Sequence, residues 1–139
     1  MRWFVDGNNV MGSVPDGWWN DPDAAAARLA QRVARWCRTH DDAVVLVFDG
    51  APRASVSDAA GGNLEVDFAP RRGRDAADDR IVERVEATYG DEPDLVVVSA
   101  DRGLVARLPP GVAVERPGRF LRRLDRSGTV GVSEASDIS

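Results

Sequence analysis

The strongest constraint on the fold is a regular alternation of apolar, β-branched runs with helical patterns. Runs typical of strands lie at residues 2–6, 43–49, 64–69, 94–100 and 112–115. Between and after them, helical patterns cover Asp23–Arg38, Ala76–Tyr89, Arg102–Leu108 and Gly118–Asp125. The runs at 43–49 and 94–99 are apolar without alternation, as strands covered on both faces require. The chain is therefore predicted to be an α/β protein, with a mostly parallel sheet sandwiched by helices.

Length and composition indicate a single domain. The chain has 139 residues, of which 43% are hydrophobic, enough for one real core and too few for two. From Arg126 the sequence is small, polar and aperiodic, so residues 126–139 are expected to be a flexible tail after a domain at 1–125. No apolar run approaches the length of a membrane span and no signal-peptide pattern opens the chain. We expect a cytoplasmic protein with no membrane partner.

Charge and cysteine content exclude several classes of function. The formal net charge of -5 argues against a protein that holds nucleic acid mainly by bulk positive charge. A nucleic-acid partner would need a local basic patch, and all 18 basic residues are arginine, the better ligand for phosphate. A single cysteine, Cys37, excludes an internal disulfide and a cysteine-based zinc site.

Acidic residues follow three of the predicted strands. Asp6 ends the first strand, Asp49 ends the second in "VLVFDGAP", and Asp101 comes just after the run "LVVVSAD". Asp78 and Asp79 open a predicted helix in "DAADDRIVERV". The carboxyl ends of parallel strands meet at one edge of a sheet, where α/β proteins usually bind ligands. Carboxylates gathered there would repel one another unless a cation lay between them, so the pattern favours a divalent metal site.

The type of ligand indicates the metal and the chemistry. Carboxylates without nearby His or Cys suit Mg²⁺ or Mn²⁺, which keep several waters and often bridge to substrate phosphate. Such an ion can lower the pKa of a bound water and orient it toward a phosphodiester. The only histidine, His40, is expected at the opposite edge of the sheet, which counts against a histidine acid/base ribonuclease.

Each of these residues also has a structural interpretation. An aspartate before glycine at a strand end is a common turn device, which applies to Asp6 and Asp49 taken singly. Asp78 and Asp79 would interact favourably with the dipole of the helix that they begin, without any metal. Asp101 could cap the helix that follows it. The coincidence of the acids at one edge favours a site over these alternatives. We assign Asn9 to the site and Asn8 to a left-handed turn.

The motifs "VDGNNVMG", "VFDG", "ADDRIVE" and "VVVSADRGL", in this order and at these separations, resemble the NYN domain. More closely, they look like its YacP-like branch, within the PIN-like ribonucleases, over roughly residues 1–125. The resemblance implies a PIN-like three-layer α/β/α domain and a metal-dependent ribonuclease with Asp6, Asp49, Asp78 and Asp101 around Mg²⁺ or Mn²⁺. Asn9 matches the family's asparagine after the first acid, and Ser99 matches a hydroxyl residue before the last; we expect Ser99 and Asp79 to support the ligands.

Aromatic and basic residues suggest where RNA binds. Trp18 and Trp19, in the loop "DGWWND", could stack on bases or pack under the loop. Arg71, Arg72 and Arg74 precede the acidic helix in "APRRGRDAADD" and are expected to clamp phosphate. Trp3 and Trp36 are assigned to the core.

Rival functions stay open at this point. A phosphatase of this type requires a "DxD" pair, where this chain has Asp6, Gly7 and Asn8. A receiver domain requires a lysine, and the sequence has none. A dinucleotide-binding domain requires a Gly-x-Gly-x-x-Gly motif, which is also absent. The stronger rival is a non-catalytic module that binds RNA or protein. The function expected is an endoribonuclease whose metal-activated water leaves 5′-phosphate and 3′-hydroxyl ends. RNA is the expected partner, and a homodimer and a ribosome or RNA-processing partner are left open.

Overall fold

The computed structural model describes residues 1–15, 17–69, 76–92 and 94–126, and every structural statement below concerns these residues. Their strands are β1 (Arg2–Asp6), β2 (Ala43–Asp49), β3 (Leu64–Ala69), β4 (Leu95–Val98) and β5 (Ala113–Glu115). Their helices are α1 (Gly7–Gly12), the short 3₁₀ helix η1 (Trp18–Asn20), α2 (Pro22–Cys37), α3 (Ala54–Ser57), α4 (Ala76–Tyr89) and α5 (Arg102–Ala106), and a last helix covers 117–126.

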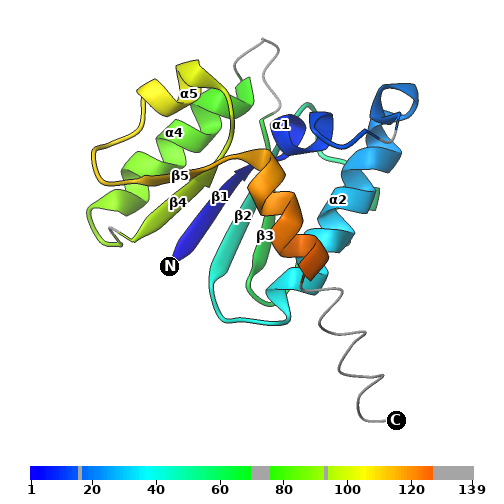
Figure 1. Ribbon diagram of the computed structural model, residues 1–139, viewed down its shortest axis with the longest axis horizontal. Helices are drawn as coiled ribbons and strands as arrows, with labels where there is room; N and C mark the ends of the chain where they lie inside the picture. The colour runs from blue at the N-terminus through cyan, green and yellow to red at the C-terminus, as the bar shows by residue number, and fades with distance from the viewer. Residues whose placement is uncertain (16, 70–75, 93, 127–139) are drawn as a thin grey trace.

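The five strands form one parallel sheet in the order β3-β2-β1-β4-β5 (Figure 1). The chain runs outward from β1 through β2 to β3, then crosses back over β1 to β4. Strand order therefore reverses between β1 and β4. In open α/β sheets, the crevice beyond such a reversal is the usual ligand site.

Side chains of alternate residues fill two separate cores, one on each face of the sheet. Trp3 points into a core with α2 and the 117–126 helix, where it meets Trp36 and Phe120. Phe4 points the other way, into a core with α4 and α5. Figure 1 shows these two layers of helices on opposite faces. The prediction of an α/β fold with a mostly parallel sheet between helices is confirmed.

The structure adds three short helices that the sequence reading placed in loops. They are α1, η1 and α3, each six residues or fewer. An apolar period cannot be read over so few residues. The longer α2 begins at Pro22 because Asp21 caps it by accepting the Ala24 N–H at 3.1 Å.

None of the helices in the described part of the chain has the length and apolar character needed to cross a membrane. The predicted tail, residues 126–139, lies outside the described residues except for Arg126, which ends the last helix instead. Arg71, Arg72 and Arg74 also lie outside the described residues.

Candidate active site

Asp6 lies at the centre of the carboxyl edge, at the end of β1. It is only 4% exposed. Its Oδ1 accepts the Asn9 N–H at 3.3 Å, capping α1, and its Oδ2 accepts the Ser99 hydroxyl at 3.0 Å. Burial raises the pKa of Asp6 to about 6; the carboxylates of Asp49 and Asp101 add to this effect, and the two hydrogen bonds oppose it. Asp6 is therefore a buried acid with two other acids near enough to influence its ionisation.

Ser99 connects Asp6 to Asp101. The buried Ser99 hydroxyl donates to Asp6, and its oxygen accepts the Asp101 N–H at 3.0 Å. The Asp101 carboxylate in turn caps α5 by accepting the Leu104 N–H at 3.1 Å. The hydroxyl thus links the end of β1 to the start of α5.

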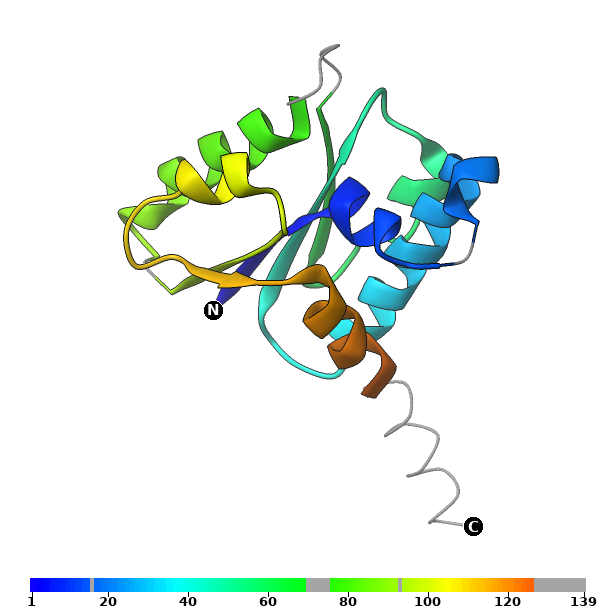
Figure 2. The same cartoon turned by 45° about the horizontal axis from the view of Figure 1, so that its top comes forward.

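Two asparagines of α1 hold the neighbouring strand ends. Asn8 Oδ1 accepts the Asp49 N–H at 2.8 Å, at the end of β2, and Asn9 Oδ1 accepts the Ala100 N–H at 2.8 Å, beyond β4. Figure 2 turns this edge toward the viewer and shows α1 directly beyond the end of β1. The assignment of Asn8 to a left-handed turn is wrong, because no described residue other than glycine has a positive φ. Its partner lies 41 residues away, and no local signal in the sequence reveals it.

Asp49 brings the start of α4 to the same edge. Its Oδ1 accepts the Ala77 N–H at 2.8 Å, so it serves the first turn of a helix that lies far along the chain. Arg53 binds the Asp49 carbonyl oxygen at 3.0 Å and lies 5.4 Å from the centroid of the Phe68 ring. Arg53 was missed by the sequence analysis, although it follows Asp49 by only four residues.

The two adjacent acids of α4 have different surroundings. Asp78 is half-buried and follows the residue bound by Asp49. Asp79 has a side chain that is 41% exposed and pairs with Arg107, just after α5, at 2.7 Å. The Asp79 carboxylate therefore forms an ion pair with Arg107, which the sequence did not predict.

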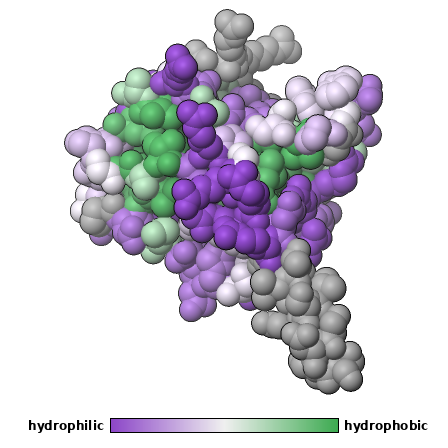
Figure 3. All heavy atoms as spheres, in the orientation of Figure 1, coloured by the Kyte–Doolittle hydropathy of each residue, from purple (hydrophilic) through white to green (hydrophobic). Residues whose placement is uncertain are grey.

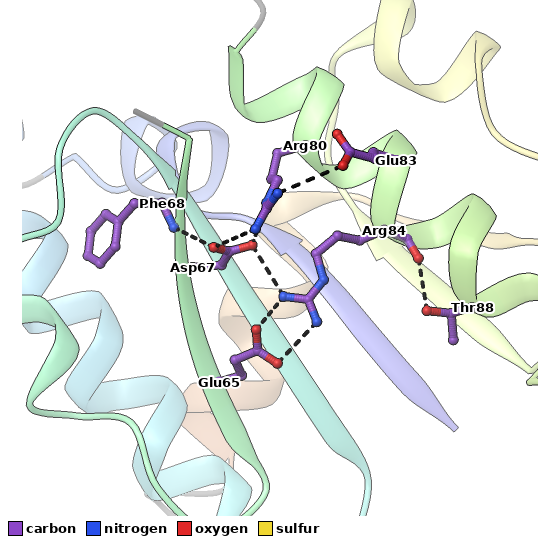
Figure 4. Close-up of polar contacts among 7 residues, drawn as sticks. All are labelled: Glu65, Asp67, Phe68, Arg80, Glu83, Arg84 and Thr88. Carbon is purple, nitrogen blue, oxygen red and sulfur yellow. Dashed lines mark hydrogen bonds and ion pairs between the residues drawn. The ribbon is translucent and has the colours of Figure 1, made fainter. Parts of the chain in front are cut away.

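A network of ion pairs fixes α4 against the edge strand β3 (Figure 4). Arg80 and Arg84 of α4 both bind Asp67, at 2.8 and 3.2 Å, and Arg84 also binds Glu65. Burial opposes ionisation of Asp67, but the hydrogen bonds from these arginines outweigh it and lower its pKa. Arg80 lies two residues after Asp78, within one turn of the helix, so the network helps to hold the start of α4 in place.

A further acid, Glu115, ends β5 at this edge. Its carboxylate is 8% exposed and accepts two hydrogen bonds from Arg123 Nε, each at 2.9 Å. The sequence analysis did not single it out, although the predicted strand 112–115 ends on it. Because Arg123 neutralises it, we assign Glu115 to structure.

The predicted RNA-binding residues are only partly described. Trp18 is half-buried and packs against the core on the α2 face, whereas Trp19 is 64% exposed. Their ring centroids lie 6.1 Å apart with planes at 84°. Trp19 is therefore the one available for stacking. Arg71, Arg72 and Arg74 lie outside the described residues.

No group of three or more His, Cys, Asp or Glu side chains close enough to hold a metal ion occurs within residues 1–15, 17–69, 76–92 and 94–126. The character of the donors still fits a hard divalent cation, because they are all oxygen ligands and Asp6 is a buried carboxylate beside two others. Mg²⁺ typically binds one or two carboxylates and retains waters, so a complete protein cage is not required.

Comparison with known proteins agrees with this architecture. The sequence profile of the YacP-like NYN domain matches residues 3–106. The crystal structure of Rae1 (YacP) from Bacillus subtilis is similar in fold, with a TM-score of 0.79 at 19% identity, covering 99% of this chain and 81% of that one. A tryptophan-to-leucine mutant of Rae1 gives a TM-score of 0.76 at 21% identity, covering 99% and 82%. A search of curated proteins finds no match.

Proposed function

The chain belongs to the family of YacP-like NYN domains, and from this membership we propose that it is a metal-dependent endoribonuclease. NYN domains are generally nucleases, which supports a nuclease-like function on RNA. One observation of the structure carries the proposal furthest. The buried Asp6 lies with Asp49 and Asp101 at the reversal of strand order, where their charges influence one another.

Asp6, Asp49, Asp78 and Asp101 are the residues that would hold the ion, directly or through water. When bound, a divalent cation supplies a water of lowered pKa and neutralises charge on the leaving oxygen. The protein's own part is to keep the acids ionised and in place. Ser99 donates to Asp6, which favours the charged carboxylate. Asn8 and Asn9 hold the backbone on either side of Asp6, so the acids come from rigid strand ends rather than from free loops.

Substrate contacts form the second part of the proposal. The exposed Trp19 would stack on bases, and Arg71, Arg72 and Arg74 would bind phosphate ahead of the acidic helix. Because the chain as a whole is acidic, RNA must be attracted by such local groups.

End-group analysis of the products tests the reaction. Purified protein is incubated with mixed RNAs, with Mn²⁺ and with EDTA, and the new ends are identified. We expect cleavage only with the metal, leaving a 5′-phosphate and a 3′-hydroxyl, because the ribose 2′-hydroxyl takes no part in attack by metal-activated water. A 2′,3′-cyclic phosphate, or full activity in excess EDTA, contradicts the proposal.

A non-catalytic RNA-binding module is the second candidate function. It would hold RNA through the same local groups, the exposed Trp19 among them, without cutting it. The same digestion separates the two functions. RNA binding without metal-dependent cleavage, across a range of RNAs and with both Mg²⁺ and Mn²⁺, supports the binding module.

A further inference from the structure

Three exposed arginines lie along one face at the start of the 117–126 helix. Arg116 comes just before the helix, and Arg119 and Arg122 follow at intervals of three residues, so neighbouring members of the set lie side by side. They line a cavity of about 500 Å³ together with Ala100 and Glu115. We call these three residues the arginine stripe. Figure 3 shows strongly hydrophilic side chains gathered over the start of this helix.

The arginine stripe adjoins the acidic edge. Ala100, which lines the cavity, stands between Ser99 and Asp101, and its N–H is bound by Asn9 at 2.8 Å. A strand of RNA with a phosphodiester at the acids would therefore extend toward the arginine stripe on the β5 side.

The stripe is available for a ligand. Arg116 and Arg122 make no ion pair with any residue in the described part of the chain, and Arg119 has only a 3.6 Å contact with Glu115 while its side chain stays 68% exposed. The Glu115 carboxylate is engaged mainly by Arg123, at 2.8 Å. The surface around Gly118 is uncrowded, since a Cβ there would meet only the Arg122 guanidinium, at 3.9 Å.

The helix beneath the stripe is firmly anchored. Phe120 is fully buried, with its ring 5.2 Å from Trp36 and 5.9 Å from Trp3. Arg123 lies over the Trp3 ring at 5.3 Å. The exposed arginines are thus presented by a rigid element, which lowers the entropic cost of binding.

We propose that Arg116, Arg119 and Arg122 bind the phosphodiester backbone of an RNA strand on the β5 side of the acidic edge. The inference rests on the proposed function in taking RNA as the substrate. Arginine forks suit phosphate geometry, and contacts to the backbone position a strand without reading its sequence. In an acidic protein, such a stripe also offsets the repulsion between the edge carboxylates and the incoming phosphates.

The test measures binding of a single-stranded RNA in EDTA, so that cleavage plays no part. The variant Arg116→Gln/Arg122→Gln is compared with Arg35→Gln/Arg38→Gln, which removes the same charge from exposed positions at the far end of α2. We expect the first variant to weaken binding roughly tenfold and to reduce the slope of log K against log salt by roughly 1.4, as for two lost phosphate contacts. The second should bind like wild type. Melting temperatures confirm that both variants fold.

Two outcomes overturn the inference. The first is equal weakening of RNA binding by both variants, which would mean that only the net charge of the protein affects binding. The second is absence of RNA binding by the wild type at low salt. The result is separable from the nuclease proposal. If the protein binds RNA through the arginine stripe but does not cleave it, the nuclease proposal is wrong and the binding surface stands. If the protein cleaves RNA but substitutions in the stripe leave binding unchanged, the binding surface is wrong and the nuclease proposal stands.

Discussion

Asp6 combines a structural and a chemical role in one carboxylate. One oxygen caps α1 and the other accepts the Ser99 hydroxyl, yet burial and two neighbouring acids still raise its pKa to about 6. The aspartate-glycine turn, which taken alone was the plain structural interpretation, is here a helix cap. Asp101 caps α5 in the same way, and Asp49 accepts an N–H from the first turn of the distant α4, so binding a helix start and membership of the site are compatible in all three acids.

The raised pKa of Asp6 predicts how stability depends on pH in metal-free protein. Between about pH 4 and 6 the folded protein holds a proton on Asp6 that the unfolded chain has released. The free energy of unfolding is therefore higher below this pH window and falls as the pH rises through it. At about 1.4 kcal/mol per pH unit, the loss is about 3 kcal/mol. Urea unfolding of wild type and Asp6→Asn in EDTA, from pH 4 to 7, measures it. We expect wild type to lose stability relative to the variant as pH rises; a difference independent of pH contradicts the environment assigned to Asp6.

The adjacent acids of α4 should differ in activity. We expect Asp78→Asn to nearly abolish RNA cleavage, because Asp78 follows the residue bound by Asp49 and shares the helix face of Ile81, Val82 and Val85, which are buried against the sheet. Asp79→Asn should cost only a modest factor, since Asp79 pairs with the exposed Arg107. Rates at saturating Mn²⁺ measure both. The assignment is wrong if Asp78→Asn stays active while Asp79→Asn is inactive.

At the scale of elements, α1 is the part that organises the site. Its first residue, Gly7, packs so closely on β2 that an added Cβ would lie 2.6 Å from the Phe48 ring and 2.8 Å from the Val47 carbonyl oxygen. Only glycine fits there without movement. The close approach brings Asn8 within reach of Asp49 and Asn9 within reach of Ala100.

Alanine substitutions at the two ends of α1 test this packing. Gly7→Ala should destabilise the protein by about 1–3 kcal/mol through overpacking and should displace the asparagines. Gly12→Ala is the matched control, because its Cβ would meet only Trp18, at 3.9 Å. It should be neutral or stabilise by about 0.5–1 kcal/mol. Chemical denaturation measures both changes, and equal effects would show that the close contact at Gly7 is unimportant.

The sequence predicted the long elements better than the short ones. Five strands and four helices could be read from apolar periods, since the sheet buries continuous runs such as "AVVLVFD". The helix α1 could not, because its sequence "GNNVMG" has poor helix formers and is held by contacts with the end of β2 and with Ala100, after β4. The strand-end acids were predictable because topology alone brings them together. The partners of Asn8 and Asp79 were not, because they depend on side-chain packing between distant segments.

At the scale of the whole molecule, charge is separated along one edge of the sheet. Carboxylates gather where strand order reverses, and the arginine stripe lies beside them on the 117–126 helix, although the chain has a net charge of -5. Helices pack on both faces of the sheet, and α1 lies beyond the end of β1 at this edge (Figure 2). The same edge therefore holds the groups suited to a cation and those suited to phosphate.

RNA cleavage by Asp6→Asn tests the central claim most directly. Single-turnover rates with Mn²⁺ are compared for wild type, Asp6→Asn and Asp94→Asn, the last a control with a 73% exposed side chain just before β4, at the opposite edge. Thermal unfolding confirms that each variant is folded. If the carboxyl edge is the catalytic centre, Asp6→Asn should be slower by at least about a hundredfold, because several kcal/mol of metal-assisted stabilisation are lost, while Asp94→Asn should match wild type. A folded Asp6→Asn that cleaves as fast as wild type would contradict the claim.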